Sequence, residues 1–112
     1  MEQNLNSDGK PLTVRLRGDL TSGNDASNKA MMELAQAARS EGRTWRDVKL
    51  DLTEARMIDS VGLNLIVSVF KAVEKNGGRL SLAYSDPNVL RTLAFTRLDK
   101  RMDLTKVEPR TK

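Results

Sequence analysis

Apolar and polar residues alternate in three short segments of the chain, and this is the pattern of strands that bury one face. The segments are 12–17, 48–52 and 80–84, and a weaker alternation covers 102–107. Apolar residues recur at helical spacing from about 26 to 42 and from 60 to 76. A shorter helical pattern follows Pro87.

Helix boundary signals agree with this pattern. Gly77-Gly78 supplies a stop for the second helix, and Ser85-Asp86-Pro87 reads as a cap followed by proline at the first helical position. The alternation of strands and helices predicts a single α/β domain. We expect a mixed β-sheet of four to five strands covered by about three to four helices.

The two ends of the chain lack a packing pattern. Residues 1–10 are polar and turn-rich, and nothing after Glu108 repeats at a strand or helix period. We therefore expect a flexible N-terminus at 1–10, one domain at 11–107 and a disordered tail at 108–112.

Composition excludes several kinds of chemistry. The 112 residues include no cysteine and no histidine, so disulfides, thiolate metal sites and Ser-His-Asp or Cys-His catalysis are ruled out. Basic residues are interleaved with acids, and only four aromatic residues are present, which argues against nucleic-acid binding in spite of the +4 net charge. No apolar run reaches the roughly 20 residues that span a bilayer. We expect a cytoplasmic protein without metal, cofactor or membrane insertion.

The segment between the second strand and the second helix carries the candidate site. Ser60 is suited to be the N-cap of the helix, where unpaired N–H groups and the helix dipole tolerate an anion. A phosphate on Ser60 would add about −1.5 to −2 charges. Asp59 would either repel that phosphate or position the hydroxyl, and Gly62 would leave space over the serine. On these residues alone, an ordinary helix cap is the better interpretation, and a nucleophile lacks a histidine to activate it.

The helix after Ser60 has a broad apolar arc. Its core-facing residues are predicted to be Val61, Leu65, Ile66, Val69, Phe70 and Val73. Leu63 and Val67 lie at the margin of this arc, near polar Asn64 and Lys71. They fit two interpretations equally, an apolar patch for a partner helix or a wider buried face.

Three stretches together resemble the STAS domain, and more narrowly bacterial anti-sigma-factor antagonists. They are residues 48–53 (VKLDLT), 57–63 (MIDSVGL) and 75–82 (KNGGRLSL), followed by a helix with Leu90, Leu93 and Leu98. The resemblance runs from about Leu12 to Leu104. The Asp-Ser-x-Gly-Leu segment combined with the downstream Gly-Gly turn is fairly specific.

The resemblance implies a partner-switching protein that is a substrate and ligand, not an enzyme. The unphosphorylated form would bind an anti-sigma-factor serine kinase, phosphorylation at Ser60 would weaken the complex, and a serine phosphatase would reset it. The free protein is expected to be a monomer. Asp59, Gly62 and Thr21 would support the phosphosite. The partner-binding residues implied are Asp19, Thr21, Ser60, Leu63, Asn64, Val67 and Lys71.

The chain departs from the family pattern at a few positions. Gly18-Asp19-Leu20-Thr21 stands where the family often has Gly-Glu-Leu-Asp, so Thr21 replaces an acidic residue near the phosphosite. Asn64 and Arg97 stand where glycines are common.

Two other functions are compatible with parts of the sequence. A STAS interaction subunit that is never phosphorylated, such as an accessory protein of a lipid-transport ATPase, would be indifferent to Ser60→Asp. A small enzyme or nucleotide binder is disfavoured, because histidine, cysteine and any Gly-x-Gly-x-x-Gly or Walker-type loop are absent.

Overall fold

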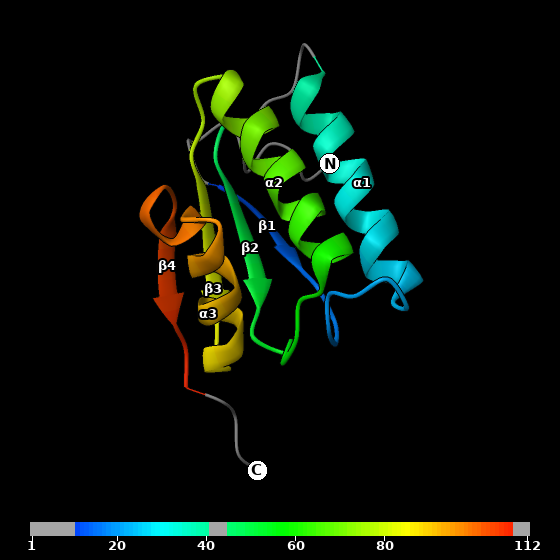
Figure 1. Cartoon of the computed structure of the whole chain (residues 1–112). Helices are drawn as coiled ribbons and strands as arrows, with labels where there is room; N and C mark the ends of the chain where they lie inside the picture. Colours follow the sequence, from blue (N-terminus) through cyan, green and yellow to red (C-terminus); the bar gives the residue numbers. More distant parts are fainter. Residues whose placement is uncertain (1–10, 41–44, 109–112) are drawn as a thin grey trace.

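Four strands form one parallel sheet in the order β1-β2-β3-β4 (Figure 1). The computed structural model describes residues 11–40 and 45–108. The strands are β1 (Leu12–Arg15), β2 (Val48–Leu52), β3 (Leu80–Tyr84) and β4 (Asp103–Lys106). The sequence predicts a mixed sheet, and every strand pair within the described residues is parallel. The predicted flexible N-terminus and all but Glu108 of the predicted tail lie outside the described residues.

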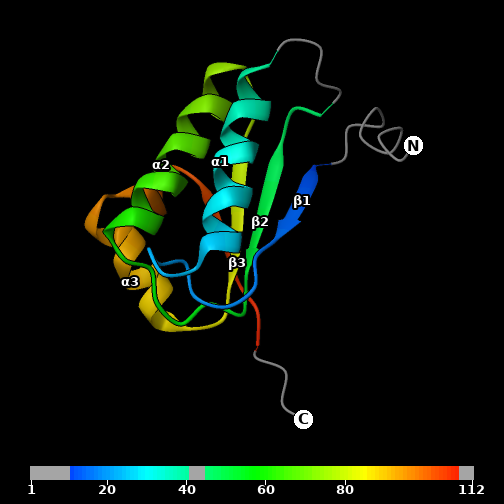
Figure 2. The ribbon, with the colours of Figure 1, turned by 90° about the vertical axis from the view of Figure 1, so that its right-hand side faces the viewer.

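Three helices connect these strands. They are α1 (Asp25–Arg39), α2 (Ser60–Lys75) and α3 (Pro87–Phe95), with a short 3-10 turn, η2 (Leu98–Lys100), before β4. The three helices lie on the same face of the sheet (Figure 2). The predicted order of elements and the single α/β domain are therefore confirmed.

The core lies between the sheet and this helical layer. On β2 and β3, the strand residues that face the helices are buried, as the alternating pattern predicts. Leu12 and Val14 on β1 and Leu104 on β4 are partly buried against the same core, and the helices contribute one apolar stripe each. The largest members are Leu50 and Leu52 on β2, Leu80 and Leu82 on β3, Met31 on α1, Ile66, Val69 and Val73 on α2, and Val89 and Leu93 on α3. The opposite face of the sheet carries exposed Thr13, Arg15 and Lys49, and no helix of the described residues covers it.

The predicted end of α2 and the predicted start of α3 are confirmed by their hydrogen bonds. Gly77 adopts a φ of 82° and closes α2, while the Gly78 N–H donates to the Val73 carbonyl at 3.0 Å. Asp86 caps α3 by accepting from the Asn88 N–H at 2.9 Å, and Pro87 is the first helical residue.

The backbone at Arg97 shows why a glycine is common at this position in the family pattern. Its φ is 63°, in the left-handed region that glycine enters at no steric cost. It lies just after α3 and immediately before η2, where the chain must turn sharply towards β4. The family's glycine is therefore suited to this conformation, which the present chain adopts with an arginine.

Candidate functional site

Two loops meet at the carboxyl ends of β1 and β2. Because these strands are parallel neighbours, the loops that follow them emerge at the same edge of the sheet (Figure 1). The first loop, residues 16–24, leads into α1, and the second, residues 53–59, leads into α2. An isolated parallel bridge joins Leu20 to Ile58, with the Leu20 N–H donating to the Met57 carbonyl at 3.0 Å. The Leu20 carbonyl in turn accepts from the Asp59 N–H at 3.2 Å.

Asp59 is the N-cap of α2. Its Oδ1 accepts from the Gly62 N–H at 2.9 Å, and its Oδ2 accepts from the Ser22 N–H of the other loop at 2.8 Å. These backbone hydrogen bonds, that from Gly62 first, lower the pKa of Asp59 below its ordinary value. The carboxylate therefore stays ionised at neutral pH and ties the start of α2 to the first loop.

This corrects the sequence interpretation of Ser60 as the cap. Ser60 is the first helical residue, one position later, and its side chain is exposed. Asp59 takes the cap position because its extended backbone (φ −95°, ψ −173°) directs the carboxylate at the N–H three residues on. Within the described part of the chain, the Ser60 hydroxyl makes no hydrogen bond. The hydroxyl is thus accessible to solvent.

The sequence interpretation held that Gly62 leaves space over the serine, but the first loop fills the space next to this glycine. A Cβ on Gly62 would lie 2.1 Å from the Leu20 carbonyl oxygen and 2.8 Å from Leu20 Cγ. The glycine instead lets the first loop pack directly on the first turn of α2.

Asp19 also turns towards the other loop. Its Oδ1 accepts from the N–H groups of Arg56 at 2.7 Å and Met57 at 3.2 Å. The Asn24 side chain stabilises the first loop, because its Nδ2 donates to the Asp19 carbonyl at 2.7 Å. Its Oδ1 caps α1 by accepting from the Ser27 N–H. Thr21 lies in the same loop, and its carbonyl accepts from the Asn28 amide at 3.0 Å.

The structure gathers only part of the predicted site. Asp19, Thr21, Asp59, Ser60 and Gly62 belong to the two interlocked loops and the first turn of α2. The remaining predicted residues follow α2 away from this edge, and Lys71 lies about 16 Å further along the helix axis than Ser60. They are Leu63, Asn64, Val67 and Lys71.

Burial divides the α2 residues differently from the sequence pattern. Leu63 and Val67 are half-buried and pack against the core, while Asn64 and Lys71 are exposed. Val61 was predicted to face the core and is 42% exposed. At about 100° per residue it lies about 140° round the helix from buried Ile66, which turns it away from the sheet.

Sequence reasoning missed two apolar residues beside Ser60. Met57 is 56% exposed and Val61 follows the serine directly, so apolar surface flanks the hydroxyl on both sides along the chain. The sequence pattern did not separate Met57 from Ile58. Met57 is exposed because Ile58 pairs with Leu20 and is buried, which turns its neighbour outwards.

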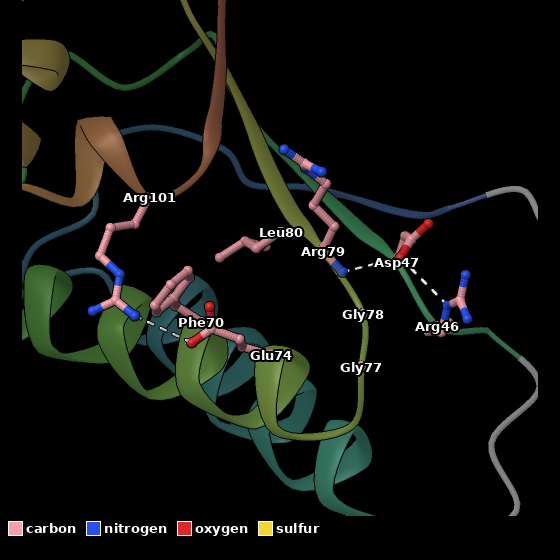
Figure 3. A pocket seen from close by; sticks show the side chains of 9 residues that line it. All are labelled: Arg46, Asp47, Phe70, Glu74, Gly77, Gly78, Arg79, Leu80 and Arg101. Carbon is pink, nitrogen blue, oxygen red and sulfur yellow. Dashed lines mark hydrogen bonds and ion pairs between the residues drawn. The ribbon is translucent and has the colours of Figure 1, made fainter.

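A concavity with a volume of about 450 Å³ lies at the opposite end of the strands, where β3 begins (Figure 3). Its arginines face carboxylates of the chain itself: Arg79 Nε lies 2.8 Å from Asp103 Oδ2, and Arg101 lies 3.4 Å from Glu74. The Arg101 guanidinium also stands 5.1 Å from the centre of the Phe70 ring. Arg46 Nε lies 4.0 Å from Asp47 Oδ1, so each arginine that lines the concavity has a carboxylate of the chain within 4.0 Å.

No group of three or more acidic, histidine or cysteine side chains in residues 11–40 and 45–108 is placed to hold a metal ion. None of the helices in these residues has the length and apolar character needed to cross a membrane.

Comparison with known proteins identifies a family model and a similar solved structure. The sequence model of the STAS domain matches residues 2–111. A solved structure from Thermotoga maritima, described as a "putative anti-sigma factor antagonist", is similar with a TM-score of 0.66 and 25% sequence identity. The match covers 88% of this chain and 84% of the Thermotoga maritima chain.

Proposed function

The chain belongs to the STAS domain family, and from this premise we propose that it is an anti-sigma-factor antagonist controlled by phosphorylation at Ser60. The observation that carries the proposal is the position of Ser60 as an exposed first residue of α2, next to two loops that hold each other in place. The similarity to the Thermotoga maritima protein supports the same role.

In the proposed cycle, the unphosphorylated protein binds an anti-sigma-factor serine kinase, and the sigma factor is released. The kinase transfers the γ-phosphoryl group of ATP to the Ser60 oxygen, the serine proton passes to a base of the kinase, and ADP leaves. A serine phosphatase hydrolyses the phosphoester with water and restores the hydroxyl. This chain supplies no catalytic group, and the use of ATP places the cycle in the cytoplasm.

The charge of the phosphate explains why the phosphorylated protein would dissociate from the kinase in this proposal. Ser60 follows Asp59, whose carboxylate stays ionised, so phosphorylation would concentrate about three negative charges at one end of α2. The Asp59 cap already occupies the Gly62 N–H. A partner packed on Met57 and Val61 would have to bury this charge, which costs several kcal/mol unless cations pair with it.

The proposed partner surface begins at Ser60 and follows α2. Asp59, Gly62 and Thr21 support the phosphosite in this proposal, and Met57 and Val61 join the contact residues as exposed apolar neighbours. The contacts further from the serine are Leu63, Asn64, Val67 and Lys71.

The test uses the anti-sigma-factor kinase encoded nearest to this protein, with ATP and mass spectrometry. We expect one phosphate, located on Ser60. Ser60→Ala should bind the kinase as wild type does, and Ser60→Asp should bind at least about tenfold more weakly, because even a single buried charge is costly. Ser40→Asp is the matched control, since it adds the same charge to an exposed serine at the far end of α1. Phosphate at another residue, or wild-type binding by Ser60→Asp, would contradict the proposal.

A constitutive interaction subunit is the second candidate function. The observation in its favour is Thr21, which carries no charge where the family pattern has an acidic residue. Such a protein would co-purify with an ATPase subunit of a lipid transporter, and Ser60→Asp would leave that complex intact.

A further inference from the structure

The resemblance implied a partner contact for Asp19, but its carboxylate is directed at the backbone of the chain itself. Oδ1 accepts from two consecutive amides, Arg56 N–H at 2.7 Å and Met57 N–H at 3.2 Å. β2 ends at Leu52, so these amides lie beyond the ladder that β2 forms with its neighbours. Without Asp19 they would depend on water.

The contact between the two loops is reciprocal. Asp59 of the second loop accepts from the Ser22 N–H of the first at 2.8 Å, as Asp19 of the first accepts from the second. Along both loops, the Leu20–Ile58 bridge comes after the hydrogen bonds of Asp19 and before the hydrogen bond between Ser22 and Asp59. Two hydrogen bonds to Asp19, two at the bridge and one to Asp59 thus cross from loop to loop.

Asp19 is itself held in place. The Asn24 amide donates to its carbonyl at 2.7 Å and to the Arg17 carbonyl at 2.9 Å. Asn24 also accepts from the Ser27 N–H at the start of α1. The acceptor that fixes Arg56 and Met57 is therefore anchored to a helix and does not move freely with its loop.

We propose that Asp19 is a positioning residue for the phosphorylation of Ser60, which acts by holding the amides of Arg56 and Met57. The proposal rests on the function proposed above and deepens it. Met57 lies three residues before Ser60 and is exposed. The hydrogen bonds of Asp19 therefore fix the backbone of the segment that a kinase would have to bind next to the serine. Asp19 needs its acceptor oxygen for this role and does not need its charge. A direct contact with a cationic group of the kinase would need the charge.

Amide hydrogen exchange followed by NMR tests the first half of the proposal on the protein alone. In Asp19→Ala, the amides of Arg56 and Met57 should exchange about tenfold faster than in wild type, because two hydrogen bonds are lost. Asp19→Asn keeps the acceptor oxygen, and its rates should stay within about threefold of wild type. Asp86→Ala is the control, because it removes another carboxylate that accepts from a backbone N–H, at α3. Unchanged exchange in Asp19→Ala would overturn the proposal.

Phosphorylation kinetics with the same kinase test the second half. Asp19→Ala should lower kcat/KM for phosphate transfer to Ser60 by about tenfold, whereas Asp19→Asn should retain at least about a third of the wild-type value. Equal losses in Asp19→Asn and Asp19→Ala would mean that the charge contacts the kinase, and would overturn the positioning role. If Asp19→Ala is unfolded by circular dichroism, Asp19→Asn against wild type still distinguishes the two roles.

The outcomes separate this inference from the proposed function. If wild type is not phosphorylated by the kinase, the proposed function fails, and the exchange rates alone decide whether Asp19 holds the loop. If wild type is phosphorylated at Ser60 and Asp19→Ala is phosphorylated equally well, only the inference fails.

Discussion

At the scale of single residues, Gly62 is where the two loops leave no room for a side chain. The Leu20 carbonyl oxygen would lie 2.1 Å from a Cβ, and it is a backbone atom that also accepts from the Asp59 N–H. Relief of the clash would therefore have to move the first loop. The glycine is needed here for close approach, although it weakens the helix in which it lies.

We predict that Gly62→Ala destabilises the protein by about 2 kcal/mol or more, even though alanine favours helices by about 1 kcal/mol. The free energy of unfolding in urea measures this. Gly23→Ala is the control, because a Cβ at Gly23 meets no atom within 4 Å, and its free energy of unfolding should change by less than about 0.5 kcal/mol. A stabilised Gly62→Ala variant would show that the loops are not packed as described.

At the scale of elements, the N-terminus of α2 depends on a carboxylate that is shared with a second loop. Asp59 caps the helix through Gly62 and binds the first loop through Ser22. Both contacts favour the ionised form, so the pKa of Asp59 is lower in the folded protein than its ordinary value of 3.8. Stability from this group is present above pH 3.8 and is lost as the pH falls through the lowered folded value.

We therefore expect Asp59→Asn to be less stable than wild type at pH 7, since its amide does not accept from Ser22 as the second carboxylate oxygen does. The difference between the two unfolding free energies should shrink steadily as the pH is lowered below about 4. Urea titrations between pH 7 and about pH 2.5 give this difference directly. A difference that stays constant over the range would mean that the Asp59 charge does not stabilise the fold.

At the scale of the whole molecule, the two loops of the site pack into the core through Leu20, Ala55 and Ile58, while the side chains next to the hydroxyl face solvent. The buried cluster is enclosed between the sheet and the helices, whereas Ser60 and Met57 are exposed. Charge added to Ser60 meets solvent and the favourable end of the α2 dipole, and is opposed by the neighbouring Asp59. A change at the site is therefore expected to alter binding without unfolding the domain.

The corresponding prediction is that Ser60→Asp unfolds with a free energy within about 1 kcal/mol of wild type, because surface charges at helix ends contribute on this scale. Thermal unfolding followed by circular dichroism compares the two, with Ser60→Ala as the uncharged control. A large loss of stability in Ser60→Asp alone would mean that weakened partner binding by this variant reflects unfolding.

Much of the fold could be predicted because its signals are local in the sequence. Alternation at 48–52 and 80–84 predicts strands with one buried face, and the structure confirms this for Leu50 and Leu82. Gly77 and Pro87 mark helix ends through backbone geometry that belongs to the residues themselves. For Val61 the periodicity was insufficient, since its exposure depends on where the core-facing arc of α2 ends against the sheet.

The sequence by itself determined the order of the elements, the apolar stripes and Ser60 as the candidate residue. Tertiary structure alone decided which atoms surround that serine. Asp19 and Arg56 are 37 residues apart, and they meet because parallel pairing of β1 and β2 brings both loops to one edge. The same two loops lie in contact where Leu20 packs on Gly62, and Asp59 joins them through the Ser22 N–H. Periodicity cannot carry such information, because hydrogen bonds between distant loops leave no repeat in the chain.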